Sequence, residues 1–182
     1  MTDSELAYDI VNGDNHGFET LVKQFQEKIF RTVMGFVHNK EDAEELTQDI
    51  FIKAYYALNS FKGKSTLSTW LYRIAVNTSI SFLRKKKRKE FWGRFPIPFN
   101  TASNDKNAAD QLAEDEEIKV VRKAIEKLPL KQSMAFVLSK YEDLPQKKVA
   151  EIMQVTEGAV EQLLIRARLN LRKWLEKNHL NP

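Results

Sequence analysis

The sequence predicts an all-α protein made of two small helical domains joined by a flexible linker, the second a four-helix domain containing a helix-turn-helix. Apolar residues recur at three- and four-residue spacing through most of the 182 residues, which is typical of amphipathic helices. Glycine and proline number only six and five, so few positions interrupt that spacing. Hydrophobic residues make up 42% of the chain and charged residues 30%, which is enough apolar material to build a core.

The first predicted domain, residues 1–90, consists of successive helices. The apolar stripe of residues 14–37 comprises Phe18, Leu21, Val22, Phe25, Ile29, Phe30, Val33 and Val37. After Asn39, residues 40–58 begin with an acidic turn that suits the positive end of a helix dipole, and their stripe comprises Ala43, Leu46, Ile50, Phe51, Ala54 and Leu58. Residues 61–69 contain Gly63 and several polar residues, which predicts a loop. The next helix is expected from about Leu67 into the basic run 84–89.

Residues 91–111 are predicted to be the linker, because two prolines, a glycine and a cluster of Asn, Ser and Asp disfavour a regular element there. The second predicted domain, residues 112–182, is helical near 113–127, 130–141, 145–153 and 156–177. Pro129 and Pro145 each fit the first turn of a new helix.

Several classes of function are disfavoured by the residues present. The chain has no cysteine, its three histidines at 16, 38 and 179 are scattered, and no glycine-rich phosphate loop occurs. The acidic cluster 41–49 lacks the Asp/Asn ladder and glycine of a calcium loop. We therefore expect no catalytic residue, metal, cofactor or small-molecule substrate, and a protein that is not an enzyme. The acidic amino terminus is unlike a signal peptide and no stretch is long and apolar enough to span a membrane, so we expect a cytoplasmic protein.

The positive charge is concentrated in two places. Residues 1–83 carry a net charge of −3, residues 84–94 of +6, residues 95–127 of −2 and residues 128–182 of +3. This asymmetry indicates a polyanionic partner that is contacted at particular places.

Residues 146–168 have the pattern of a helix-turn-helix. Val149, Ala150 and Met153 are expected to face inward from a short helix, and Val160, Leu163, Leu164 and Ala167 from the helix that follows a turn at Gln154. The second helix would lie in the major groove of duplex DNA with its amino-terminal turns against base edges. We assign this contact to Thr156, which also caps the helix, with Glu157, Gly158, Gln162 and the phosphate-binding Arg166. An ordinary helical hairpin is the alternative, and two residues depart from the motif: Gln154 where glycine is usual, and Glu161, whose carboxylate is repelled by phosphates.

Aromatic and basic residues are interleaved around the predicted loop and the helix after it, a composition that suits single-stranded DNA because bases stack on rings while cations hold the backbone. A polar loop can also line a pocket for a flipped base. The candidate single-strand contacts are Phe61, Lys62, Lys64, Ser65, Trp70, Arg73, Asn77, Arg84 and Lys85. The alternatives are a solvated charge run for 84–89 and core packing for the apolar members, which we favour for Leu71, Ile74 and Phe82.

Residues 43–88 closely resemble the second conserved region of extracytoplasmic-function (ECF) sigma factors of the sigma-70 family, and residues 128–173 resemble their fourth region. The resemblance implies that Glu45, Gln48 and Asp49 bind a coiled coil of core RNA polymerase. It also implies that residues 61–77 bind the melted minus-ten element as single strand, the second domain binds the minus-thirty-five duplex, and an anti-sigma factor holds the protein inactive. Ser81 stands where many relatives have Asp, so any contact or helix interaction of that acid is absent. Glu161 and Leu163 stand where many relatives have basic residues, so the minus-thirty-five sequence and its salt dependence cannot be copied from relatives.

Three other classes of protein remain as alternatives. A stand-alone regulator would bind an operator tightly without polymerase, whereas a sigma factor would bind DNA weakly alone. An enzyme lacks support from the residues above, and a helical interaction module would use its basic run only for solubility. The sequence leaves open whether the two domains pack together and hide the DNA surfaces or swing on the linker.

Overall fold

The computed structural model describes residues 6, 15–61, 63–93 and 116–178. These residues are helical apart from short turns and contain no strand, which confirms the all-α prediction. The elements are α2 (Asn15–Val37), α3 (Lys40–Ala57), the short 3₁₀ helix η1 (Leu58–Ser60), α4 (Leu67–Gly93), α5 (Glu116–Glu126), α6 (Leu130–Lys140), α7 (Gln146–Met153) and α8 (Glu157–Lys177).

The first domain is a bundle of α2, α3 and α4, each of which contacts the other two. Its core contains the stripe residues that the periodicity predicted, with Phe18, Val22 and Phe30 packed at its margin. The fully or almost fully buried side chains include Leu21, Ile29, Val33, Ala43, Ile50, Ala54, Leu67 and Leu71. Burial of one such Leu or Ile side chain contributes roughly 2 kcal/mol, so this core is sufficient to fix the three helices together.

The turn between α2 and α3 is built by two residues. His38 ends α2 with a left-handed φ of 54°, and its N–H donates to the carbonyl oxygen of Met34 at 3.0 Å. Asn39 then caps α3, because its side chain accepts a hydrogen bond from the Asp42 N–H at 2.8 Å. The chain therefore reverses direction within two residues, and α2 and α3 lie side by side.

The second domain packs α6, α7 and α8 against one another, with α5 against α8. Pro129 and Pro145 immediately precede α6 and α7, where a missing N–H costs nothing. The inward residues predicted for the helix-turn-helix are buried at Val149, Ala150, Val160 and Leu164, while Met153 and Leu163 pack at the margin of the core.

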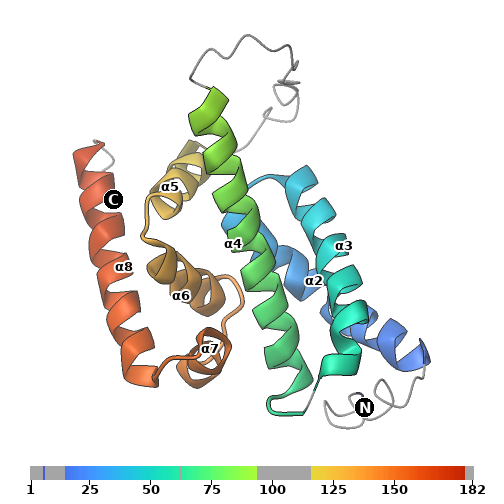
Figure 1. Ribbon diagram of the computed structural model, residues 1–182. Coiled ribbons are helices and arrows are strands. Elements are labelled where there is room, and N and C mark those ends of the chain that lie inside the picture. The colour runs from blue at the N-terminus through green and yellow to red at the C-terminus, as the bar shows by residue number, and fades with distance from the viewer. Residues whose placement is uncertain (1–5, 7–14, 62, 94–115, 179–182) are drawn as a thin grey trace.

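The two domains lie against each other in the described structure. α4 is long and central, with α2 and α3 on one side and the second domain on the other (Figure 1). α2 contacts α6 and α4 contacts α7, and the buried residues of both domains form one continuous apolar cluster. Of the two arrangements left open by the sequence, the structure therefore has the packed one.

The observed bounds differ slightly from the predicted ones. α4 continues to Gly93, three residues into the segment predicted as linker, and residues 94–111 lie outside the described residues. Within residues 15–61, 63–93 and 116–178, no helix combines the length and apolar character needed to cross a membrane. In the same ranges, no group of three or more acidic or histidine side chains is placed to hold a metal ion.

Candidate nucleic-acid interface

The two aromatic residues predicted to contact single-stranded DNA pack against each other. The rings of Phe61 and Trp70 lie 5.3 Å apart and are tilted by 56°, and both side chains are half-buried at the margin of the core. Each ring therefore keeps an exposed part, but neither stands free in solvent.

The loop before α4 is organised by Thr66. Its hydroxyl oxygen accepts from the Thr69 N–H at 3.2 Å and its carbonyl accepts from the Trp70 N–H at 3.0 Å, which caps the first turn of α4. Lys64 is exposed and Ser65 is half-buried beside this turn. The predicted contact Lys62 lies outside the described residues.

Arg73, Asn77 and Arg84 share one face of α4, because they are separated by four and then seven residues. We call these three residues the single-strand face. Asn77 and Arg84 are exposed, as is the neighbouring Lys85, whereas Arg73 is half-buried against the second domain. One Arg73 Nη donates to the carbonyl oxygen of Glu151 in α7 at 2.8 Å. The Arg73 Nε is buried and has no hydrogen-bond partner in the part of the chain that the structure describes.

The six residues of the basic run 84–89 are all exposed on α4. Within this run, Lys86 has a described ion pair, with its Nζ 2.9 Å from Asp42 Oδ2. The same Nζ lies 5.8 Å from the centre of the Phe82 ring. An exposed pair of this kind adds little stability, so the run is available to a polyanion.

The turn of the helix-turn-helix accommodates its unusual glutamine. Gln154 adopts the left-handed conformation, with φ 56° and ψ 46°, and its N–H donates back to the last turn of α7. Thr156 then caps α8 by accepting from the Ala159 N–H at 3.2 Å. Gln154 therefore occupies the conformation that favours glycine, as the sequence suggested, and the motif forms despite it.

The amino-terminal turns of α8 are open to solvent. Every residue assigned there to duplex contact is exposed, namely Thr156, Glu157, Gly158, Gln162 and Arg166. Glu161 is exposed beside them, and the structure gives it no described partner. The second domain can therefore place this end of α8 against a groove without rearranging internally.

The acidic surface of α3 is broader than the sequence suggested. Glu45, Gln48 and Asp49 are all exposed. Ile52 and Tyr56, seven and eleven residues after Glu45, continue the same helical face and are 54% and 78% exposed. Sequence analysis missed Ile52 and Tyr56. Both fall outside the apolar stripe of α3, and an apolar residue outside the stripe is the signal that could have indicated an exposed apolar surface.

Comparison with known proteins decides the family. The sequence profile of sigma-70 region 2 matches residues 21–89, and that of sigma-70 region 4 matches residues 118–171. The chain is 32% identical to the RNA polymerase sigma-H factor of Pseudomonas aeruginosa, over 96% of this chain and 94% of that protein. It is 33% identical to the ECF RNA polymerase sigma-E factor of Escherichia coli K12, over 92% of this chain and 91% of that protein.

The chain belongs to the ECF sigma factors of the sigma-70 family. It is an RNA polymerase sigma factor that directs promoter-specific transcription, as the resemblance implied. Two solved structures share the fold of this sigma factor at 23% identity. CnrH, in complex with the cytosolic domain of CnrY, has a TM-score of 0.71 and covers 96% of this chain and 97% of that chain. The sigma factor RpoE of Bartonella quintana, in complex with the anti-sigma factor NepR, has a TM-score of 0.62 and covers 87% and 96%.

The sigma factor has a polar cluster between its domains that sequence analysis did not find. Arg31 of α2 contacts Glu142, which follows α6, with Nε to Oε1 at 3.3 Å and Nη2 to Oε2 at 3.5 Å. The Tyr72 hydroxyl of α4 donates to Glu142 Oε2 at 3.2 Å. We call Arg31, Tyr72 and Glu142 the domain clasp. Residues 31 and 142 are 111 positions apart, so no local pattern could have paired them.

The centre of the domain clasp is buried from solvent. The Glu142 side chain is only 1% exposed, and this burial raises the pKa of its carboxyl group, while Arg31 and Tyr72 oppose that rise. Burial, with the nearby carboxylate, likewise raises the pKa of Tyr72. The cluster therefore holds a desolvated carboxylate whose hydrogen bonds depend on the other domain.

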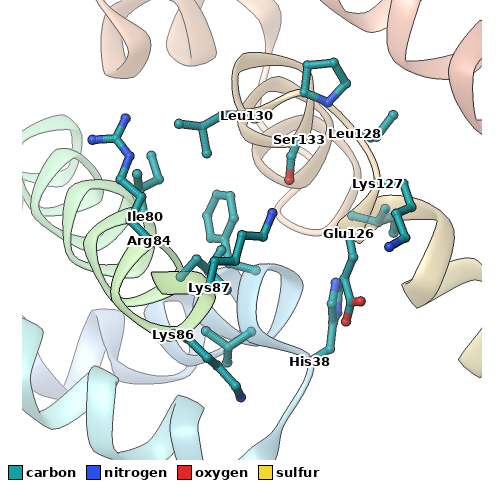
Figure 2. Close-up of a pocket in the computed structure, with 15 residues that line it drawn as sticks. His38, Ile80, Arg84, Lys86, Lys87, Glu126, Lys127, Leu128, Leu130 and Ser133 are labelled. Carbon is teal, nitrogen blue, oxygen red and sulfur yellow. The ribbon is translucent and has the colours of Figure 1, made fainter. Parts of the chain in front are cut away.

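A cavity of about 680 Å³ separates the sigma factor's domains beside the basic run. Figure 2 shows Lys87 directed into this space toward Leu130 and Ser133, with His38 on the opposite wall near Glu126. The Nε2 of His38 is buried and has no hydrogen-bond partner among the described residues. Burial, followed by the positive charge of Arg122, lowers the pKa of His38 to about 4.

Proposed function

We propose that this sigma factor binds the melted minus-ten element through the single-strand face of α4. The observation that carries this proposal is the exposure of Asn77 and Arg84 on one side of a helix that continues into the basic run 84–89. Asn77 offers a hydrogen-bond donor and acceptor to a base edge, and the cations hold the backbone. Phe61 and Trp70 supply the adjoining apolar ring surface. Strand opening is then driven by binding energy and needs no hydrolysis.

The second domain, residues 112–182, is proposed to bind the minus-thirty-five duplex through α8. Thr156, Glu157, Gly158 and Gln162 lie where a recognition helix meets base edges, and Arg166 lies about one turn after Gln162, within reach of a phosphate. Residues 1–90 form the other functional unit and residues 91–111 the linker. The exposed amino-terminal turns of α8 support this assignment.

Core polymerase is proposed to bind α3 of the first domain. Glu45, Gln48 and Asp49 provide the acidic part of the surface, and the exposed Ile52 and Tyr56 add apolar area beside them. A surface of exposed apolar side chains bordered by charges is typical of protein–protein contact.

Four further properties belong to the proposal. The protein acts in the cytoplasm, where polymerase and promoter meet, and it acts without catalysis of its own. An anti-sigma factor regulates it, as suggested by the Bartonella quintana relative whose structure contains one. No metal or other cofactor takes part.

The test of the minus-ten assignment is Asn77→Ala, with Gln24→Ala as the matched control. Gln24 is also an exposed amide side chain, but it lies on α2, outside the surfaces assigned to DNA and polymerase, so both changes remove an amide group from the surface of a helix. Loss of a base contact of about 1–3 kcal/mol predicts roughly 5- to 150-fold weaker open-complex formation. We expect Asn77→Ala to have that effect in strand-opening footprints while its affinity for core polymerase stays unchanged. An equal loss of core binding, or an equal effect of Gln24→Ala, contradicts the assignment.

The test of the duplex assignment is the salt dependence of promoter binding by the Arg166→Gln variant. Neutralising one phosphate contributes about 0.9 to the slope of log K against log salt. We expect the slope to become shallower by about that amount, and an unchanged slope would remove Arg166 from the phosphate contacts. Tight operator binding by the wild-type chain without polymerase would instead favour a stand-alone regulator.

A further inference from the structure

The contact between the two domains occupies part of the proposed minus-ten surface. Arg73 of the single-strand face is bonded to the Glu151 carbonyl of α7 at 2.8 Å. In the loop before it, Thr66 accepts from Lys148 Nζ at 2.6 Å, and Thr69 donates to Glu151 Oε2 at 3.4 Å. α7 therefore engages side chains at and beside the surface that the proposed function assigns to melted DNA.

The same contact brings together two surfaces that a promoter keeps apart. Minus-ten and minus-thirty-five elements are centred about 25 base pairs apart, which is roughly 85 Å along B-form DNA. In the structure, α7 of the helix-turn-helix touches α4 itself (Figure 1). Both elements cannot be bound at once in this arrangement, so the domains must separate before the protein engages a whole promoter.

We infer that the packed arrangement is an autoinhibitory contact built into this chain, with Glu142 as the residue that holds it closed. The inference rests on the proposed function for the masking of Arg73, but the closing contact itself does not depend on any role in DNA binding. Glu142 belongs to the second domain, and both of its described partners, Arg31 and Tyr72, belong to the first.

The interface is tight at one end and hollow at the other, which suits a contact that must open. At the tight end, Gly35 of α2 lets α6 approach so closely that a Cβ there would lie 2.7 Å from Val137 Cγ1. At the hollow end, the cavity of about 680 Å³ leaves the two domains without direct packing beside Lys87. The buried carboxylate of Glu142 lies in a polar part of the interface. Such a pair gives strong geometric preference but modest net stabilisation, because its desolvation offsets its attraction.

The experiment measures the distance between domains in full-length protein with opposite charge changes in the clasp. Since the natural chain has no cysteine, single cysteines at the exposed positions Gln24 and Glu176 can carry a donor and an acceptor dye. Glu142→Lys and Arg31→Glu each place like charges against one another, whereas the double variant Arg31→Glu/Glu142→Lys restores an opposite pair. We expect both single variants to lose energy transfer and the double variant to regain it.

The second readout is affinity for a fluorescent pool of randomised ten-nucleotide single-stranded DNA. If nine-tenths of the wild-type molecules are closed, full opening raises the apparent affinity about tenfold. The two single variants change the net charge in opposite directions, so an effect of charge alone would move their affinities in opposite directions. We expect both affinities to rise.

The outcomes separate this inference from the proposed function. Unchanged energy transfer in both single variants overturns the clasp. Opening with no gain in affinity, or with affinities that follow net charge, overturns its inhibitory role. If, in addition, Asn77→Ala has no effect on DNA binding by the opened variants, the proposed single-strand face is also wrong. The inference is supported if both single variants lose energy transfer and gain affinity for single-stranded DNA, and if the double variant reverses both changes.

Discussion

Replacing Gly35 with alanine is expected to separate the domains while leaving each one folded. Gly35 lies on α2 where α6 of the other domain passes. A Cβ at this position would be 2.7 Å from Val137 Cγ1 and 3.3 Å from two ring atoms of Tyr141. Non-bonded carbon atoms do not approach to 2.7 Å. The Val137 side chain cannot readily rotate away, because a β-branched side chain in a helix has one strongly preferred rotamer. The added methyl group therefore acts as a wedge between α2 and α6.

The size of the shift between the packed and separated forms depends on which of the two forms each effect of the substitution acts on. Alanine is better than glycine within a helix by roughly 1 kcal/mol, but α2 is helical in both the packed and the separated forms, so this gain cancels from the equilibrium between them. Overpacking typically costs about 1–3 kcal/mol, and only the packed form bears it. The ratio of separated to packed molecules should rise about 5- to 150-fold, since about 1.4 kcal/mol corresponds to a factor of ten.

Energy transfer between dyes at positions 24 and 176 measures this ratio. The matched control is Gly35→Ala/Val137→Ala, in which the atom that meets the new methyl group is removed. We expect the single variant to lose energy transfer and the double variant to recover it relative to Val137→Ala alone. If Gly35→Ala only raises the unfolding midpoint and leaves energy transfer unchanged, the close approach of α2 and α6 is not present in solution.

The remaining predictions concern stability. His38 binds a proton in the unfolded chain below a pKa of 6.5 but resists it in the folded chain down to about 4, so the free energy of unfolding should fall as pH drops through this interval, on the order of 1 kcal/mol per pH unit. His38→Asn, which tolerates the left-handed turn, should flatten that dependence in urea unfolding series; an unchanged slope would show that His38 is not the group responsible. Thr156→Ala should cost about 1 kcal/mol by removing the α8 cap and Thr156→Ser almost nothing, whereas equal losses would mean that the hydroxyl bond to Ala159 is unimportant. Gln154→Gly should stabilise the second domain by about 0.5 kcal/mol, because relief of the left-handed strain outweighs the entropy of an added glycine; thermal unfolding that shows a loss would contradict this.

The helices were predictable because each depends on residues close together in sequence. The apolar stripe of α2 recurs every three or four residues, and the core side of each helix follows from it. Local chemistry also located the start of α8, because Thr156 caps it as its side chain suggests, and Gln154 takes the left-handed conformation of the turn before it. The two regions of the sigma-70 family were recognisable for the same reason, since each is a continuous segment.

The contact between the domains could not be predicted, because periodicity shows which face of a helix is apolar but not which surface covers it. Glu142 has the sequence context of an ordinary surface acid, yet its carboxylate is buried against Arg31, 111 residues earlier. Arg73 was predicted to contact DNA, and no local pattern indicated that α7 would bind it. The exposed Ile52 and Tyr56 were missed for a related reason, since an apolar residue outside the stripe is visible only after the core has been placed.

Transcription from defined promoters with purified components tests the central claim most directly. Core RNA polymerase is incubated with this protein and genomic fragments, and run-off transcripts are mapped. The account predicts new, discrete start sites that require the protein, that weaken with Asn77→Ala and that persist with Gln24→Ala. Absence of any protein-dependent start site, or association too weak to detect between the chain and core polymerase, would contradict it.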